Sequence, residues 1–189
     1  MTRTMHPWLL GLVAATLAAC HSPQAAPDAR DNPHMTAAIE EEAPSLADAA
    51  RATYWGGQAR QITLDNGGFE GPEGQRVELL RQHYAMGDLE GDGAVDAVVA
   101  LSVTNAGDET GHYLAVLRHL GMDTISLGTA FLGHPVEVER VHVEGRRVIV
   151  DLKRRSATDP ECCPSEPARV VYVLGRGELV KVDDTSTTR

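Results

Sequence analysis

The chain has 189 residues, and its 27 acidic residues outnumber its 17 lysines and arginines to give a formal net charge of −10. This acidity argues against nucleic acid or an anionic lipid surface as a partner, because both attract basic proteins. A chain of this length has room for one domain with its own hydrophobic core.

The first twenty residues are typical of a secretory signal peptide. Arg3 provides a weakly basic start, and a mainly apolar run of thirteen residues follows from Pro7 to Ala19. An apolar helix needs about 20 residues to cross a bilayer, so this run is too short to span one. We therefore expect residues 1–19 to be cleaved, which would bring the net charge to −11 because they contain one arginine and no acid.

The expected cleavage site also indicates a lipid anchor. Leu17-Ala-Ala-Cys20 resembles the bacterial lipobox, which implies lipidation of Cys20 and a mature protein held on the membrane of the cell envelope. His21 stands where inner-membrane retention often uses Asp, so the resemblance implies the outer membrane, facing the periplasm. The alternative is a plain secreted protein with an accidental cysteine at this position.

The segment after Cys20 mixes proline, alanine and acids without an apolar period, so residues 20–44 are interpreted as the lipidated cysteine and a flexible linker. Ser45 with Asp48 predicts a capping box for a short helix that ends near Ala52. We expect a β-rich domain over residues 45–183 and a disordered tail over residues 184–189.

From Ala52 onward, short runs of β-forming residues alternate with turn residues. The expected strands cover residues 52–55, 61–64, 76–85, 97–104, 112–118, 124–132, 136–143, 147–153, 169–174 and 178–182. The gaps are too short for parallel crossovers, so the sequence predicts an all-β, antiparallel meander in the form of a curled sheet, sandwich or open barrel.

Two strands carry further information. Residues 112–118 are apolar on both faces, which predicts a central strand with residues 97–101 beside it. In residues 136–143 the apolar phase slips, which predicts a β-bulge near Glu139 and Arg140.

The stretch GDLEGDGAVDAVV, residues 87–99, predicts a calcium site. Calcium prefers six to eight oxygen ligands, and alternate side chains of a tight loop supply them. The candidate ligands are Asp88, Glu90, Asp92, the carbonyl of Ala94, and Asp96. Because crowded carboxylates repel one another, a cation among them is favoured.

The loop differs from an EF-hand, because Val99 stands where a bidentate glutamate is needed. It resembles instead the D-x-[DN]-x-D-G-x-x-D loop of integrin-type β-modules, although Glu90 replaces the usual Asp or Asn. Magnesium would fit worse, since it demands stricter octahedral geometry. The alternative interpretation is a polar turn without an ion.

The second unusual stretch is DPECCPSEPA, residues 159–168. With Cys20 lipidated, Cys162 and Cys163 can pair only with each other. Neighbouring Cα atoms lie about 3.8 Å apart, below the usual disulfide range of about 4.4–6.8 Å, so a bond between them is expected to be easily reduced. The alternative is two thiols packed as small hydrophobic groups.

The order of these motifs resembles an uncharacterised group of bacterial secreted and lipoprotein β-modules, some of which lie beside META-type domains. The group carries a GDLxGDGxxDAxV loop, a YLAVV-like strand, an FLGDRVxV segment and a DPxCCPS turn, and the resemblance runs from about Thr53 to Val180. It implies an envelope location and a β-rich module without established catalysis. This chain departs from it at His134, where the group has Asp, and at the NAGDETG turn.

Known catalytic motifs are not recognised in the sequence, and its histidines are scattered, so neither an enzyme nor a zinc site is expected. The favoured function is a non-catalytic lipoprotein whose calcium-stabilised β-domain binds or scaffolds an unknown envelope protein or ligand. The alternatives are a thiol-disulfide redox sensor at Cys162 and Cys163, or an enzyme of unrecognised type that uses Glu90, Asp96 and nearby histidines.

Overall fold

The computed structural model describes residues 42–186 except 57–59, 106–108 and 161. The predicted signal peptide, the lipidation site at Cys20 and nearly all of the predicted linker lie outside the described residues.

The described chain begins with the short helix α1 (Leu46–Ala49). Ser45 Oγ accepts a hydrogen bond from the Asp48 amide at 3.2 Å, and Asp48 Oδ2 accepts one from the Ser45 amide at 2.9 Å. This reciprocal pair satisfies amides that the first turn of a helix leaves without partners. The predicted capping box is confirmed.

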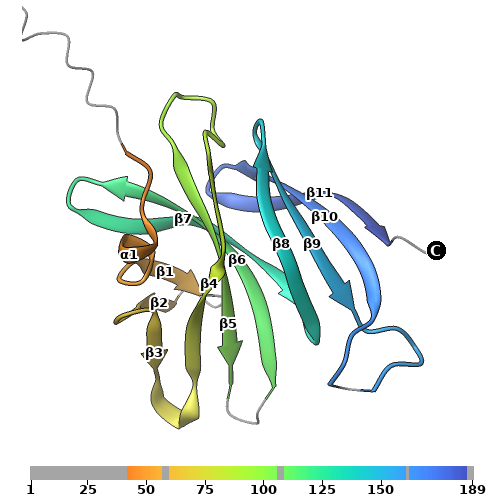
Figure 1. The fold of residues 1–189 in the computed structure, drawn as a ribbon. Coiled ribbons are helices and arrows are strands. Elements are labelled where there is room, and N and C mark those ends of the chain that lie inside the picture. Colours follow the sequence, from red (N-terminus) through yellow and green to blue (C-terminus); the bar gives the residue numbers. More distant parts are fainter. Residues whose placement is uncertain (1–41, 57–59, 106–108, 161, 187–189) are drawn as a thin grey trace, which may run out of the picture. The chain divides into compact units, whose positions relative to one another are not determined.

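Strands make up most of the remaining described chain (Figure 1). Their bounds are β1 (Thr53–Gly56), β2 (Arg60–Thr63), β3 (Gly68–Glu70), β4 (Arg76–Gly87), β5 (Asp96–Thr104), β6 (Thr110–Leu120), β7 (Asp123–Gly133), β8 (Val136–Glu144), β9 (Arg147–Arg154), β10 (Glu166–Gly175) and β11 (Glu178–Ser186). A single 3₁₀ turn, η1 (Pro72–Gly74), connects β3 to β4.

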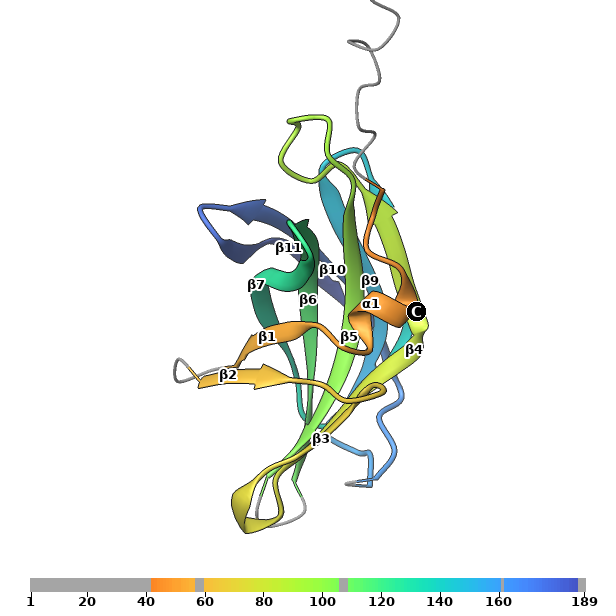
Figure 2. The ribbon, with the colours of Figure 1, turned by 90° about the vertical axis from the view of Figure 1, so that its left-hand side faces the viewer.

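The strands form two sheets. The larger has seven strands in the order β2-β1-β7-β6-β5-β4-β3 and curls into a nearly closed barrel, and the smaller has four in the order β11-β10-β9-β8 (Figures 1 and 2). Neighbours are antiparallel except β1 and β7, which pair in parallel at Thr53 and Ile125. The all-β, mainly antiparallel prediction is confirmed.

A turn between β2 and β3 brings the two ends of the seven-stranded sheet together. Asn66 and Gly67 both have positive φ angles of 49° and 88°, as a tight Asn-Gly hairpin turn requires. The Gly67 amide donates to the carbonyl of Ala50 at 2.7 Å, and the Leu79 amide donates to the carbonyl of Gly67 at 2.8 Å. The turn therefore ties β4 to the segment that follows α1.

The seven-stranded sheet has an apolar core on each face. Inside the curl, Val99 and Leu117 pack with residues of α1, β1 and β4. On the outer face, Val98 and Val116 pack against the four-stranded sheet. Because β5 and β6 contribute to both cores on alternate residues, they are apolar on both faces, and the central position predicted for them is confirmed.

The predicted bulge is also confirmed, because the pairing of β8 with β9 shifts register between Val138 and Arg140. Two features differ from expectation. β3 was not predicted, because only three residues form it and two of its neighbours are glycines. The disordered tail was expected from residue 184, whereas β11 continues to Ser186, with Asp184 held by Arg154 and Lys181 at 2.7 and 2.8 Å.

Candidate functional site

The acidic loop, residues 88–96, connects β4 to β5 and is shaped by Asp88. Asp88 Oδ1 accepts the amides of Gly91 and Asp92 at 2.6 and 3.2 Å, and its Oδ2 accepts the Gly93 amide at 3.0 Å. Desolvation acts to raise the pKa of Asp88, but these amide hydrogen bonds lower it overall. The positive φ angles of Gly91 and Gly93, 77° and 90°, permit this tight turn.

Asp96, the last residue of the loop, is fully buried. Its Oδ2 accepts the Leu89 amide at 3.1 Å, and its Oδ1 accepts Arg118 Nε at 2.8 Å, with Arg118 Nη2 at 2.7 Å. Burial raises the pKa of Asp96, and the Leu89 amide and Arg118 oppose that shift. A buried carboxylate is costly unless it is paired and hydrogen-bonded, and here it is both.

The same arginine reaches the other carboxylates of the loop. Arg118 Nη1 lies 2.6 Å from Glu90 Oε2 and 3.0 Å from Asp92 Oδ2. Burial acts to lower the pKa of Arg118, whereas Asp96, Asp92 and Glu90 raise it overall. One guanidinium group, on the central strand β6, therefore neutralises the repulsion that the sequence attributed to a missing cation.

The predicted calcium ligands lie together on this loop: Asp88, Glu90, Asp92, Ala94 and Asp96. As arranged, they do not fit a calcium ion. Both oxygens of Asp88 face backbone amides, Asp92 Oδ1 accepts the Ala94 amide at 3.0 Å, and Arg118 occupies the space among the other carboxylates. Within the described residues, no three His, Cys, Asp or Glu side chains are grouped as a metal ion requires. The calcium site stays a prediction, and an ion there would have to displace Arg118.

Sequence reasoning missed Arg118, although a signal for it was present. The hairpin of β5 and β6 pairs Ala97 with Leu117, which places Asp96 and Arg118 side by side. An arginine that ends an otherwise apolar central strand needs a buried or half-buried anion, and Asp96 begins the neighbouring strand.

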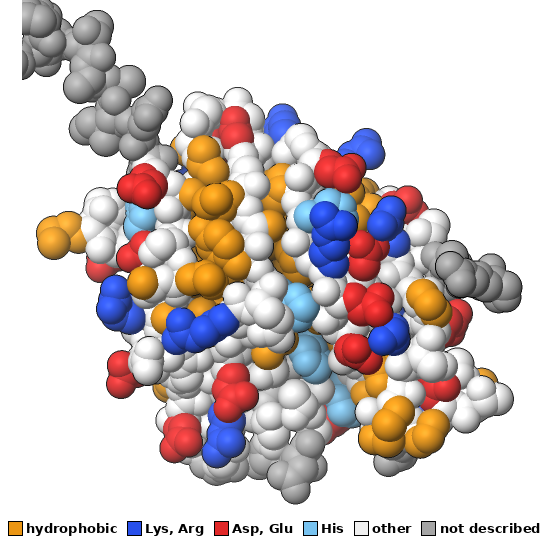
Figure 3. Space-filling model, in the orientation of Figure 1, with side chains coloured by type: hydrophobic (Ala, Val, Ile, Leu, Met, Phe, Trp, Pro, Cys, Tyr) orange, Lys and Arg blue, Asp and Glu red, His pale blue; other side chains and the backbone are white. Residues whose placement is uncertain are grey.

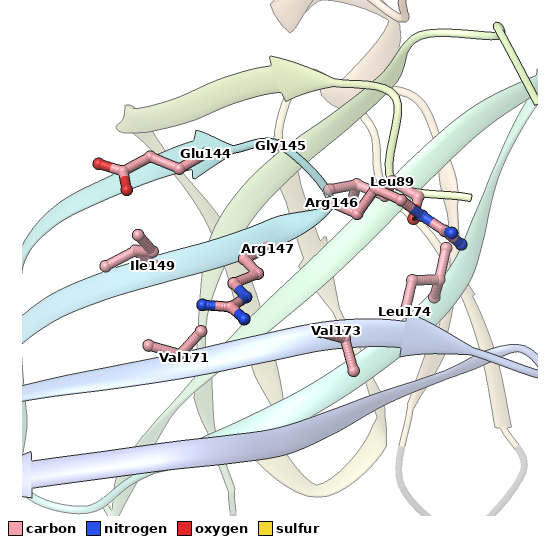
Figure 4. A pocket seen from close by; sticks show the side chains of 9 residues that line it. All are labelled: Leu89, Glu144, Gly145, Arg146, Arg147, Ile149, Val171, Val173 and Leu174. Carbon is pink, nitrogen blue, oxygen red and sulfur yellow. Dashed lines mark hydrogen bonds between the residues drawn. The ribbon is translucent and has the colours of Figure 1, made fainter. Parts of the chain in front are cut away.

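A hollow of about 660 Å³ adjoins the acidic loop (Figure 4). Ile149, Val171 and Val173 of β9 and β10 line its apolar side. Arg146 and Arg147, at the turn between β8 and β9, supply two guanidinium groups, and Figure 4 shows Arg147 extending from β9 toward β10. The hollow thus combines apolar surface with cationic groups.

Arg146 connects the hollow to the acidic loop. Its Nε donates a hydrogen bond to the carbonyl of Leu89 at 3.1 Å, and its charge helps to lower the pKa of Asp88. The loop is therefore braced from both sheets, by Arg118 of the barrel and by Arg146 of the four-stranded sheet. Charges of both signs are interspersed over the surface of the smaller sheet (Figure 3).

The structure also brings histidines together that are far apart in the sequence, and Figure 3 shows a run of them across one face. His112 pairs in register with Gly133, which precedes His134. Burial lowers the pKa of His112, and the charges of His134 and His83 lower it further. The Nδ1 atom of His112 is buried without a hydrogen-bond partner. In the described part of the chain these side chains do not form a metal-binding group.

Cys162 and Cys163 lie in the connection between β9 and β10, where a disulfide joins them. Both residues are exposed. The base of this connection is held by Asp159, whose pKa is lowered to about 2 by hydrogen bonds from Ser156 and Ser165.

No helix in the described residues is long and apolar enough to cross a membrane. Comparisons with protein-family models, with curated proteins and with solved structures find no match for this chain.

Proposed function

We propose that the chain is a bacterial envelope lipoprotein, anchored through Cys20 to the outer membrane, whose β-domain binds an envelope ligand or protein. The lipobox-like sequence supports the anchor, and the mainly polar segment 21–44 supports a tether that separates the domain from the lipid surface. The binding role is proposed from the domain itself.

The observation that carries the binding role is the braced acidic loop beside the hollow. Binding sites combine apolar surface with a few placed polar groups on rigid elements. The hollow offers Ile149, Val171 and Val173 together with Arg146 and Arg147. Guanidinium groups recognise carboxylates and phosphates in bidentate geometry. The ligand class that fits is therefore an anionic group attached to an apolar body.

The anchor is tested by expressing the full chain and its Cys20→Ser variant in bacteria and measuring their masses and membrane fractionation. The wild type should carry lipid on Cys20 and sediment with the membrane, whereas the variant should appear without lipid in the soluble fraction. An unlipidated wild type would contradict the anchor while leaving the binding role open.

The binding role is tested with a photo-crosslinking amino acid at position 173 in the hollow. The matched control carries it at position 122, which is fully exposed on the opposite hairpin of β6 and β7. Adducts that form only from position 173 and disappear when Arg147→Ala is added support the role. Identical adducts from both positions, or adducts indifferent to Arg147, reject the hollow as the binding surface.

A further inference from the structure

We propose that the Cys162–Cys163 disulfide is a thiol-disulfide exchange site that accepts electrons from a dithiol. The proposal depends on neither the lipid anchor nor the hollow. It rests on how the connection between β9 and β10 is held, and on what a bond between adjacent residues can contribute to the fold.

The connection is closed by Asp159 rather than by the cysteines. Asp159 Oδ2 accepts the amides of Ser156 and Ser165, both at 2.8 Å, and its Oδ1 accepts Ser165 Oγ at 2.7 Å. These hydrogen bonds join the two ends of the connection. The strands beyond them are already in register, with Glu166 paired to Arg154. The disulfide lies outside this closed base.

A disulfide stabilises a fold mainly by shortening the loops of the unfolded chain, and its effect grows with the number of residues enclosed. The bond between Cys162 and Cys163 spans a sequence separation of 1. It encloses the smallest possible loop and removes little freedom from the unfolded chain. Packing does not require it either, since both cysteines are exposed. The bond is therefore available for chemistry that leaves the fold intact.

The exchange proceeds in two steps. A thiolate of the dithiol attacks one cysteine sulfur, the Cys162–Cys163 bond breaks, and the departing thiolate takes up a proton. The second thiol of the dithiol then loses its proton and attacks the mixed disulfide, which releases the other cysteine. Two electrons and two protons pass to the cysteines, and the dithiol becomes a disulfide. In the oxidising envelope the oxidised pair is the resting form.

A dithiol is the matching reductant because the two cysteines are adjacent. When a monothiol attacks, the freed neighbouring cysteine lies beside the mixed disulfide and can expel the monothiol again. A dithiol escapes this reversal, because its own second thiol completes the reduction. The geometry thus selects the class of reductant.

The test equilibrates the folded full chain with dithiothreitol or, at equal thiol concentration, with glutathione. Free thiols at 162 and 163 are then trapped with a maleimide and measured by mass spectrometry. We expect reversible reduction by dithiothreitol and at least tenfold less by glutathione. The Cys163→Ser variant should instead accumulate a stable adduct with glutathione. Two free thiols in the air-oxidised protein, or reduction only after denaturation, overturns the proposal.

A second measurement separates exchange from a structural role. Circular dichroism melting of the reduced, oxidised and Cys162→Ser/Cys163→Ser forms should agree within about 2 °C, since surface changes of this kind have small effects on stability. Hydrogen exchange at the Ser156 and Ser165 amides should accelerate in Asp159→Asn and stay unchanged on reduction. If reduction exposes these amides as strongly as Asp159→Asn does, the disulfide is structural and the proposal fails.

Discussion

Replacing Arg118 with methionine tests the account of the acidic loop most directly, because the change removes the charge and keeps most of the side-chain length. Asp96 is fully buried and the Arg118 side chain is 18% exposed, and loss of one partner from a buried ion pair costs about 3–5 kcal/mol. Glu90 and Asp92 are 41% and 49% exposed, so each adds only about 0–1 kcal/mol. Nearly all of the loss should therefore come from Asp96.

Urea unfolding followed by circular dichroism would measure this loss, and a drop in melting temperature of about 6–20 °C should accompany it. Adding Asp96→Asn to Arg118→Met should recover most of the stability, because the amide is neutral and still accepts from Leu89. Arg76→Met is the matched control, since Arg76 contacts Glu70 in a pair 59% and 81% exposed, and it should cost under about 1 kcal/mol.

The sign of the pH dependence provides a second readout. Without Arg118 the pKa of the buried Asp96 rises further, so the folded variant takes up a proton before the unfolded chain does. The stability deficit of Arg118→Met relative to the wild type should then shrink as the pH falls from 7 toward 4. A loss under about 1 kcal/mol, or a deficit that does not change with pH, would refute the assignment of Arg118 as the counter-ion of Asp96.

Three further predictions concern other parts of the domain. Calcium and Arg118 compete for the same oxygens, so calorimetry should find tighter calcium binding in Arg118→Met than in the wild type, and equal binding would place any ion elsewhere. Burial lowers the pKa of His112 from 6.5, so the unfolded state protonates first and stability falls as the pH drops below 6.5; His112→Gln should reduce that fall in urea titrations between about pH 7 and 5, and an unchanged slope would contradict it. A Cβ at Gly87 would lie 2.5 Å from Val143 Cγ1, so Gly87→Ala should cost about 1–3 kcal/mol by overpacking where β4 meets β8, whereas Gly175→Ala, which meets no neighbouring atom within 4 Å, should not.

Local features of the fold could be predicted from the sequence because neighbouring residues determine them. The capping box of Ser45 and Asp48 joins residues three apart. The bulge near Arg140 follows from side chains that alternate strictly along a strand. The hairpins follow from short connections that parallel strands cannot use. In each case the interacting groups lie within one element or in two consecutive ones.

The curl of the larger sheet was open at the sequence level, where a curled sheet, a sandwich and an open barrel were equally compatible with the strands. Closure depends on the parallel pairing of β1 with β7, whose partners Thr53 and Ile125 are far apart in the chain. No spacing or composition near either residue encodes that choice. It is decided by which arrangement buries both faces of β5 and β6.

The acidic loop shows the same division between sequence and tertiary structure. The crowding of carboxylates in residues 88–96 was evident from spacing alone, and so was the need for a positive charge among them. The identity of that charge was decided by sheet register, which places Arg118 against Asp96 across 22 residues of chain. A covalent chain specifies local chemistry directly, but it specifies distant partners only through the packing of the whole core.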